Sequence, residues 1–274
     1  MNMFSLKNKT VILTGSTGYL GKYFARALAD FGARVLLLGR NQEKLDSLLG
    51  ELQKEYPESQ CAVYCFDQYD HEEARRQYER MIAEEKKIDI LINNAFDFSK
   101  NTGFNDPSGR WENVTYEKAV TMFDSAFYWA FQAIQIIGPV MKQQGSGSII
   151  NIGTFHADHP PMKGIYEGTT IFNPIIYGPQ KAALKLLTKR MAVELAPEVR
   201  VNMISPGPVP NTAGKSANAI TKDDPVLSRL SKRILFDRMG HPTDLTGAVI
   251  YFASDASSWT TGVNFVIDGG YDVA

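Results

Sequence analysis

The stretch Thr10-Val11-Ile12-Leu13-Thr14-Gly15-Ser16-Thr17-Gly18-Tyr19-Leu20-Gly21 decides the fold. Its first five residues are apolar or β-branched and do not alternate with polar ones, which is typical of a strand buried on both faces of a parallel sheet. Glycines at 15, 18 and 21 follow directly, and an amphipathic helical pattern then runs to about Phe31. This order predicts a tight turn where backbone N–H groups and a helix amino end can approach a pyrophosphate.

Strand and helix patterns alternate along the rest of the chain. The predicted strands are 10–14, 34–38, 61–66, 88–92, 147–152, 200–205 and 262–267. The predicted helices include 42–54, 71–85, a long one at 116–142, 177–195 and 242–253. Such alternation predicts an α/β fold with a parallel sheet and helices on both faces. We expect one domain over residues 1–274, with long loops at about 97–113, 155–174 and 211–240.

Composition excludes several classes of protein. The 274 residues carry a net charge of -1, so nothing indicates nucleic acid or an anionic membrane as the main partner. No apolar run reaches the ~18 residues of a membrane span, and the polar amino terminus is unlike a signal peptide. Two cysteines and four histidines show no metal-ligand spacing, so we expect no metal site and a reducing cytoplasm.

Tyr177 and Lys181 form the candidate catalytic pair. They stand four residues apart, so on a helix their side chains share one face. An ammonium group one turn away favours the phenolate, which predicts a lowered pKa for Tyr177. Pro179 lies between them and is tolerated only in the first turn of a helix. The helix is therefore expected to begin close to residues 173–176, with Asn173 as its cap.

Several motifs, taken in order, resemble the short-chain dehydrogenase/reductase family in its single-domain branch. They are Thr14-Gly15-x-x-Gly18-x-x-Gly21, Asn93-Asn94-Ala95, Tyr177-x-x-x-Lys181, Pro206-Gly207 and Thr261-Gly262 with Asp268-Gly269-Gly270. They cover nearly the whole chain. The resemblance implies a Rossmann-like, doubly wound fold, a nicotinamide cofactor, hydride transfer between that cofactor and a carbonyl or alcohol, and a homo-oligomer, dimer or tetramer.

The resemblance also implies roles for individual residues. Tyr177 would be the general acid/base, Lys181 would lower its pKa and hold the nicotinamide ribose, and Thr154 would stand where the family places a serine that bonds the substrate oxygen. The implied cofactor-binding residues are Gly15, Ser16, Thr17, Gly18, Tyr19, Leu20, Gly21, Arg40, Asp67, Gln68, Asn94, Ala95, Tyr177, Lys181, Pro206, Gly207, Val209 and Thr212.

The residue after the second strand bears on the choice of cofactor. An acidic side chain there would bond the ribose 2′-OH of NAD and repel a 2′-phosphate. This chain has Arg40, whose guanidinium can pair bidentately with phosphate. NADP is therefore favoured and NAD remains possible, because Thr17 stands where many NADP enzymes of the family carry a second basic residue.

Three departures from the family pattern bear on the substrate. First, Phe96 stands where the family has a glycine. Second, the helical asparagine that anchors a relay water in the family is missing, and Asp124 and Ser125 are the candidates to replace it. Third, Thr154 and Tyr177 are 23 residues apart instead of about thirteen. Extra length beside a site usually contacts substrate, and this insertion is polar. We therefore expect a polar substrate. The segment 166–169 is also similar to short-chain enzymes of bacterial flagellin and surface-glycan modification, which points to a sugar or sugar-derived intermediate; packing between subunits is the competing explanation.

The first hypothesis is an NAD(P)-dependent oxidoreductase that acts on a polar carbonyl or alcohol. One alternative is a dinucleotide-binding regulatory or scaffold protein on the same fold with little turnover, which the missing asparagine, Phe96 and Thr154 favour and which Tyr177 and Lys181 oppose. Another is a sugar epimerase or dehydratase of the longer branch of the family, which the modest length and the Asp268-Gly269-Gly270 ending disfavour.

Overall fold

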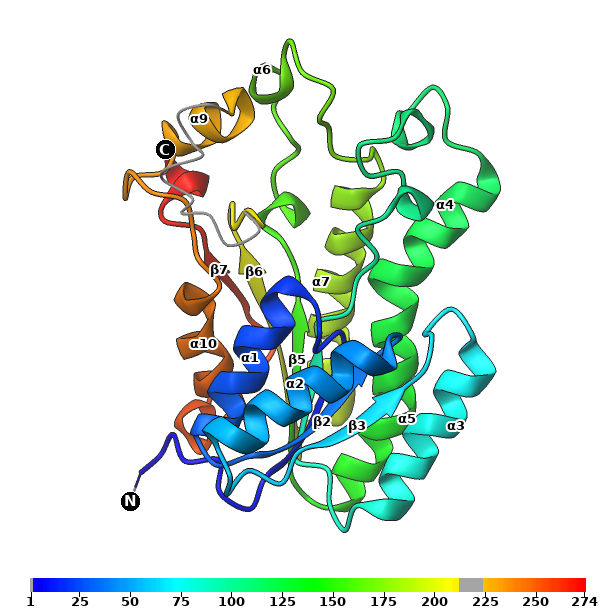
Figure 1. Cartoon of the computed structure of the whole chain (residues 1–274), viewed down its shortest axis with the longest axis vertical. Coiled ribbons are helices and arrows are strands. Elements are labelled where there is room, and N and C mark those ends of the chain that lie inside the picture. Colours follow the sequence, from blue (N-terminus) through cyan, green and yellow to red (C-terminus); the bar gives the residue numbers. More distant parts are fainter. Residues whose placement is uncertain (1, 212–223) are drawn as a thin grey trace.

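A seven-stranded parallel sheet forms the centre of the molecule (Figure 1). The computed structural model describes residues 2–211 and 224–274. The strand order is β3-β2-β1-β4-β5-β6-β7, and each neighbouring pair is parallel. The strands are β1 Thr10–Leu13, β2 Arg34–Gly39, β3 Ala62–Cys65, β4 Ile90–Asn93, β5 Gly147–Ile152, β6 Val199–Pro206 and β7 Asn264–Ile267. This confirms the predicted Rossmann-like class.

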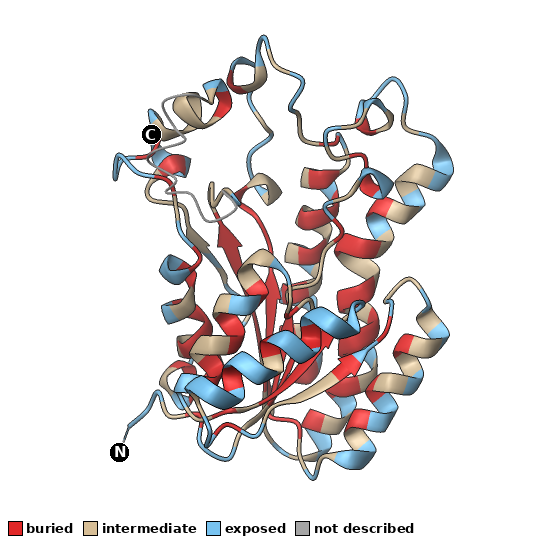
Figure 2. Ribbon diagram, viewed as in Figure 1, coloured by how far each residue is buried: buried red, intermediate tan, exposed pale blue. Residues whose placement is uncertain are grey.

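Helices cover both faces of the sheet. On one face lie α1 (Tyr19–Asp30), α2 (Gln42–Glu55) and α10 (Thr243–Ala253), and on the other lie α3 (His71–Glu84), α5 (Trp129–Gln143) and α7 (Tyr177–Leu195). In β1, Val11 and Leu13 join the first of these two cores and Ile12 joins the second. The sheet is therefore apolar on both sides, as Figure 2 shows by the buried strands, and its uninterrupted apolar runs follow from that.

Shorter elements lie at the carboxyl edge of the sheet. They are α4 (Tyr116–Phe123), α6 (Lys163–Tyr166), α9 (Pro225–Ser231) and the single turns at Lys100–Thr102, Pro107–Gly109, Phe155–Ala157 and Tyr271–Val273, whereas the turn at Asp255–Ser257 lies at the amino edge beside Lys9. Those at 100–109 and 155–166 belong to two of the three predicted loops, and α9 belongs to the third. In Figure 1 these segments stand above the ends of β4, β5 and β6. Long insertions at this edge can line a site without disturbing the sheet.

The long helix predicted at 116–142 is interrupted. The chain forms α4, then a π-helical segment at Asp124–Tyr128, then α5. The interruption is therefore not at Gly138-Pro139, because α5 runs through Pro139 to Gln143. A π segment inserts extra residues between turns, and it is common at functional sites. The helical pattern of the sequence cannot show it, because the residues remain helical on both sides.

The order of the strands reverses between β1 and β4. β1 leads on one side to β2 and β3, and β4 leads on the other to β5, β6 and β7. In an open parallel sheet a crevice forms outside the carboxyl ends of the strands at such a reversal, and ligands bind there. The glycine turn follows β1 and Asn93-Asn94-Ala95 ends β4, so both predicted motifs lie at this point.

No helix within residues 2–211 and 224–274 is both long and apolar enough to cross a membrane. No group of three or more histidine, cysteine, aspartate or glutamate side chains in that part of the chain is arranged to hold a metal ion.

Candidate active site

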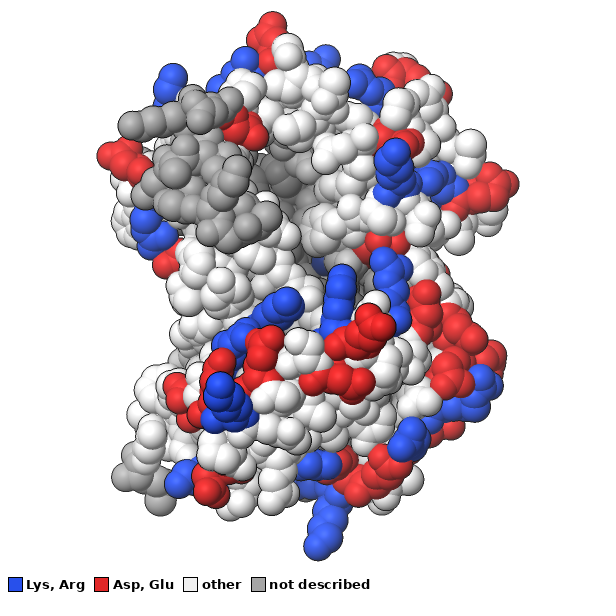
Figure 3. Space-filling model, in the orientation of Figure 1, with Lys and Arg blue, Asp and Glu red and all other residues white. Residues whose placement is uncertain are grey.

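A cleft of about 670 Å³ opens at the reversal of strand order, and Figure 3 shows the surface hollowed there with Lys and Arg side chains along its rim. Most of the residues predicted for cofactor and catalysis line this one cleft. They are Gly15, Thr17, Gly18, Tyr19, Leu20, Arg40, Asp67, Gln68, Asn94, Ala95, Thr154, Tyr177, Lys181, Pro206, Gly207 and Val209. Ser16 and Gly21 do not line it. Thr212 lies outside the described residues.

Ser16 and Gly21 shape the glycine turn from behind the cleft wall. Ser16 is fully buried and its hydroxyl donates to the Leu38 carbonyl at 3.1 Å. A Cβ at Gly21 would stand 2.2 Å from the Gly15 carbonyl oxygen, so only glycine fits. Gly15 itself has φ +64, a conformation that glycine adopts without strain. The side positions of Ser16 and Gly21 are filled by the chain itself, and their contact with the cofactor stays a prediction.

The amino end of α1 faces the cleft without a side-chain cap. Gly18 is its N-cap residue and makes no side-chain hydrogen bond. The first N–H groups of a helix lack partners within it and attract anions. This end of the turn is therefore suited to a phosphate group.

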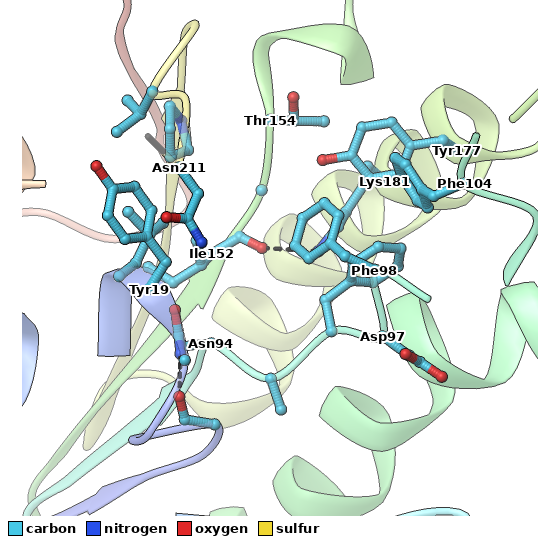
Figure 4. Close-up of a pocket in the computed structure, with 18 of the residues that line it drawn as sticks. Tyr19, Asn94, Asp97, Phe98, Phe104, Ile152, Thr154, Tyr177, Lys181 and Asn211 are labelled. Carbon is cyan, nitrogen blue, oxygen red and sulfur yellow. Dashed lines mark hydrogen bonds between the residues drawn. The ribbon is translucent and has the colours of Figure 1, made fainter. Parts of the chain in front are cut away.

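Asn94 joins the glycine turn to the end of β4. Its amide Nδ2 donates to the carbonyls of Thr14 at 3.0 Å and Gly15 at 3.1 Å. The Thr14 hydroxyl in turn accepts from the backbone N–H groups of Asn94 at 2.9 Å and Ala95 at 3.0 Å. Figure 4 shows Asn94 directed at the turn, which leaves its backbone and Ala95 to form the cleft wall.

Arg40 lies at the rim of the cleft. Its guanidinium is half exposed and stands 3.8 Å from the carboxylate of Asp97, which is buried. Asp97 also accepts hydrogen bonds from the Tyr69 hydroxyl and the Ser99 backbone N–H, each at 3.1 Å. Asp97 is therefore held by partners of its own, and Arg40 keeps donors directed to solvent beside Asp67 and Gln68.

Gly207 brings the end of β6 against the last loop of the chain. A Cβ there would stand 2.4 Å from Cβ of Asp268, so the Pro206-Gly207 turn and the Asp268-Gly269-Gly270 ending require each other. The Asp268 carboxylate accepts from the N–H groups of Gly270 at 2.9 Å and Asp272 at 2.8 Å. The Asp268-Gly269-Gly270 ending therefore supports, from behind, the Pro206-Gly207 turn that lines the cleft.

Tyr177, Thr154 and Lys181 meet inside the cleft. Tyr177 is the first residue of α7 and is buried, as predicted from Pro179. Thr154 and Tyr177 both line the cleft, and Figure 4 shows the Tyr177 hydroxyl below the Thr154 side chain, whose hydroxyl oxygen accepts from the His156 backbone N–H at 3.3 Å. A hydrogen bond from Thr154 lowers the pKa of Tyr177, but burial is the larger effect and raises that pKa to about 12. The phenol is therefore protonated at neutral pH.

Lys181 does not lower the pKa of Tyr177 in this structure, which corrects the prediction. Its Nζ donates to the Ile152 carbonyl at 3.0 Å and lies 5.0 Å from the centre of the Phe96 ring. Burial of the ammonium group lowers the pKa of Lys181 to about 8. Desolvation, which penalises either charged form, thus dominates over the attraction expected from a spacing of four residues.

Three phenylalanines surround the catalytic pair, and we call Phe96, Phe98 and Phe104 the aromatic cluster. Ring centres of Phe96 and Phe104 lie 5.4 Å and 5.2 Å from that of Tyr177, and Phe98 lies 4.5 Å from Phe96. All three line the cleft. Sequence analysis singled out Phe96 as a departure from the family pattern but missed Phe98 and Phe104. The alternation Phe96-x-Phe98 was the available signal.

The insertion contributes a polar cluster, which we define as His156, Tyr166 and Asn173. Asn173 Nδ2 donates to His156 Nε2 at 3.2 Å and to the Tyr166 hydroxyl oxygen at 2.7 Å. All three residues line the cleft. Asn173 is therefore not the cap of α7, whose N-cap residue is Ile176 without a side-chain bond. Its amide is engaged by the insertion instead.

Neither candidate for the missing asparagine faces the cleft. The Asp124 carboxylate pairs with His71 at 3.2 Å, and the buried Ser125 hydroxyl donates to the Met122 carbonyl at 3.2 Å. Neither residue lines the cleft. Both residues lie in the π-helical segment, and their side chains bond to residues of the helices α3 and α4 instead of facing the cleft.

Comparison with known proteins shows the family. A family model described as enoyl-(acyl carrier protein) reductase matches residues 18–272, nearly the whole chain. The chain belongs to the short-chain dehydrogenase/reductase family. As a short-chain dehydrogenase/reductase it is an NAD(P)-dependent oxidoreductase, and this favours an enzyme over the regulatory or scaffold alternative.

Individual relatives of this short-chain dehydrogenase/reductase differ in substrate. A sorbose reductase of Schizosaccharomyces pombe is 31% identical, and the match covers 98% of this chain and 98% of the relative. A 3α-hydroxysteroid dehydrogenase of Mediterraneibacter gnavus is 29% identical, and the match covers 96% of this chain and 97% of the relative. A gluconate 5-dehydrogenase of Burkholderia cenocepacia, solved with NADP and tartrate, has a TM-score of 0.84 at 26% identity and covers 100% of this chain and 98% of its own. These relatives give no support to the narrower resemblance to flagellin and surface-glycan enzymes.

Burial of the Lys181 ammonium group is expected to lower the free energy of unfolding of this short-chain dehydrogenase/reductase at neutral pH. The pKa of Lys181 is below its ordinary value of 10.5 when folded, so the unfolded chain binds the proton more tightly. This reduction of the free energy of unfolding has its full size below about pH 8, becomes smaller as the pH rises toward 10.5 and is absent above that pH. Lys181→Met should therefore raise the free energy of unfolding at pH 7 by about 1–2 kcal/mol, after the lost bond to Ile152 is allowed for.

The measurement is urea unfolding of both proteins at pH 7 and pH 10 without added nucleotide. The difference between them should shrink at pH 10. Lys189→Met, on the exposed side of the same helix, is the control and should change stability little at either pH. A Lys181→Met protein that is less stable than wild type at pH 7 would show that the ammonium group is a net stabiliser.

Proposed function

We propose that this enzyme prefers NADP(H) and transfers hydride to or from a polar carbonyl or alcohol, a sugar or sugar-derived compound. The observation that carries the proposal is the convergence of the Tyr177 and Thr154 hydroxyls in one cleft, with Lys181 one helical turn away. The comparisons support the class of reaction, and the residue roles and the substrate are our own inference.

The proposed chemistry assigns the proton to Tyr177. The nicotinamide supplies the hydride to the carbonyl carbon, while the phenol O–H of Tyr177 donates its proton to the carbonyl oxygen, so that an alcohol forms. Thr154 donates a hydrogen bond to the same oxygen and stabilises the charge that develops on it. Burial keeps the phenol protonated at neutral pH, which suits reduction; oxidation needs the phenolate and is expected to be faster at high pH.

Lys181 would act once the nicotinamide ribose is bound. Its ammonium group is buried, with one hydrogen bond to Ile152 and the Phe96 ring beside it. An ammonium group has three donors, so Lys181 can bond a ribose hydroxyl while it keeps the bond to Ile152. Polar contacts to the ribose would also compensate part of its desolvation, which raises its pKa again and brings a positive charge near Tyr177.

The remaining cleft residues would hold the dinucleotide. We place the pyrophosphate at Gly15 to Leu20, the adenosine beside Asp67, Gln68, Asn94 and Ala95, and the nicotinamide carboxamide at Pro206, Gly207 and Val209. Arg40 stands at the rim with free donors and would pair with a ribose 2′-phosphate. The gluconate 5-dehydrogenase relative was solved with NADP, which supports this preference.

A polar substrate is supported by the polar cluster. His156, Tyr166 and Asn173 face the same cleft as Tyr177, and the insertion that supplies them is ten residues longer than the family spacing. The sorbose reductase and gluconate 5-dehydrogenase relatives are named for polyhydroxylated compounds. The aromatic cluster on the other side would also suit a steroid, for which one relative is named; a steroid offers few hydroxyls to the polar cluster.

We further propose a homo-oligomer, dimer or tetramer, in the cytoplasm. On α7, Leu186 is 68% and Val193 is 70% exposed. Trp259, which follows the turn at Asp255–Ser257, is fully exposed. On the edge strand β7, Phe265 is 47% exposed. Apolar side chains gathered at a sheet edge and on one helix indicate a contact surface. The two thiols, Cys61 and Cys65, form no disulfide, which suits a reducing compartment.

Tyr177→Phe should abolish turnover but leave nucleotide binding intact. Loss of the proton donor should lower kcat/KM by about 10²–10⁴-fold. NADPH binding is measured by its fluorescence, and NADPH oxidation is followed with the ketoses sorbose and fructose as probes. Tyr116→Phe, on the exposed face of α4, is the matched control. Full activity in Tyr177→Phe would refute the assigned donor, and failure of the wild type to bind either nucleotide would refute the function.

Arg40→Gln should weaken NADPH binding and leave NADH binding unchanged. A charge-assisted hydrogen bond to the 2′-phosphate contributes enough that Kd for NADPH should rise about tenfold or more. Both dissociation constants are obtained by fluorescence titration, with Arg76→Gln on the far helix α3 as control. Tight NADH binding beside weak NADPH binding in the wild type would contradict the proposed preference.

Light scattering of the full chain should give a mass of two or four copies. Leu186→Glu places a charge on the apolar surface of α7 and should reduce the mass. Lys44→Glu, on the exposed side of α2, should not. A wild-type mass of a single copy at micromolar concentration would exclude the proposed assembly.

A further inference from the structure

The protonation of His156 follows from its neighbours. Its Nδ1 lies 3.0 Å from the His159 carbonyl oxygen, which can only accept, so Nδ1 carries the proton. Burial is the largest influence on the ring and lowers the pKa of His156, so the ring is neutral at neutral pH. The neutral ring has one proton, and Nε2 is therefore an acceptor.

This assignment orients the amide of Asn173. Because Nε2 accepts, the atom of Asn173 at 3.2 Å from it must be the amide nitrogen. The other N–H of the same nitrogen points to the Tyr166 hydroxyl oxygen at 2.7 Å. Both amide protons are then used, and Asn173 Oδ1 has no hydrogen-bond partner among the residues that the structure describes. Tyr166 accepts with its oxygen, so its own O–H proton remains to be donated.

The polar cluster thus offers the cleft one acceptor and one donor. Asn173 Oδ1 is the acceptor and the Tyr166 hydroxyl is the donor, 2.7 Å from the nitrogen of the same amide. One alcohol group needs both an acceptor for its proton and a donor for its oxygen. The pair therefore matches a single hydroxyl group of a ligand.

The position of this pair relative to Tyr177 is set by backbone contact. A Cβ at Gly178 would stand 2.9 Å from the His156 carbonyl oxygen, so glycine allows the insertion to lie directly on the first turn of α7. The ring centre of His156 is 6.3 Å from that of Tyr177. The donor and acceptor pair is consequently one side chain away from the proposed proton donor.

We infer that Asn173 and Tyr166 form a subsite for a hydroxyl group next to the reacting carbon, so that the substrate is an α-hydroxy carbonyl compound or the vicinal diol derived from it. The inference rests on the proposed function, since it takes Tyr177 as the group that meets the carbonyl oxygen. The carbonyl oxygen lies at Tyr177 and Thr154, and the neighbouring hydroxyl lies between Asn173 Oδ1 and Tyr166. The aromatic cluster covers the C–H side of the molecule on the opposite wall.

Matched ketones test the subsite. NADPH-dependent reduction of 2-hydroxycyclohexanone is compared with that of cyclohexanone, which lacks only the hydroxyl. A site built to bond a hydroxyl discriminates against the analogue without it, so kcat/KM should be at least about tenfold higher for the hydroxy ketone. Tyr166→Phe should lower its kcat/KM about tenfold, mainly through KM, and leave cyclohexanone unchanged. Asn173→Leu should also remove the preference, and Tyr116→Phe should not.

The outcomes separate the subsite from the reaction. Equal kcat/KM for the two ketones in the wild type, or a preference that persists in Tyr166→Phe, overturns the subsite and leaves the proposed function standing. A loss that is equal for both ketones in Tyr166→Phe shows a structural role only and also overturns it. Absence of turnover with either ketone, in protein that fails to bind NADPH, overturns the proposed function and the subsite with it.

Discussion

The Thr14 hydroxyl holds together the two halves of the sheet where the cleft begins. It donates to the Ile92 carbonyl at 3.2 Å and accepts from the N–H groups of Asn94 and Ala95. Below this point β1 and β4 are joined by their parallel ladder, and at its end Asn94 Nδ2 adds bonds to the carbonyls of Thr14 and Gly15. The separation between the glycine turn and the end of β4, which form two walls of the cleft, therefore depends on Thr14 together with Asn94.

Local chemistry made much of the fold predictable. Uninterrupted apolar runs such as Thr10 to Leu13 identified strands buried on both faces, and Pro179 located the start of α7, because each effect acts within a few residues. The π segment at 124–128 and the role of Asn173 were not predictable in this way. Asn173 is a good cap in isolation, but a histidine and a tyrosine brought by the insertion compete for its amide.

Predictions about the candidate active site were limited in the same way, because local sequence signals do not show how the chain packs around it. Motif order identified the residues that line the cleft, but it did not show the packing of Ser16 and Gly21 behind the cleft wall or the raised pKa of Tyr177. Each depends on how tightly the surrounding chain packs: a carbonyl 2.2 Å from a Cβ at Gly21, or full burial of a phenol and an ammonium group. Spacing along a helix shows which side chains share a face, but desolvation is set by everything that covers that face, including the aromatic cluster.

The contact of Gly178 with the His156 carbonyl has a consequence for how such an enzyme could change its specificity during evolution. His156 and Tyr177, the proposed proton donor, meet at one corner, and the proposed cofactor wall is formed by other strands. Residues 157 to 172 can therefore vary in length and sequence, provided that this corner keeps its shape. A lineage could explore new substrates by loop exchange without re-optimising its proton transfer.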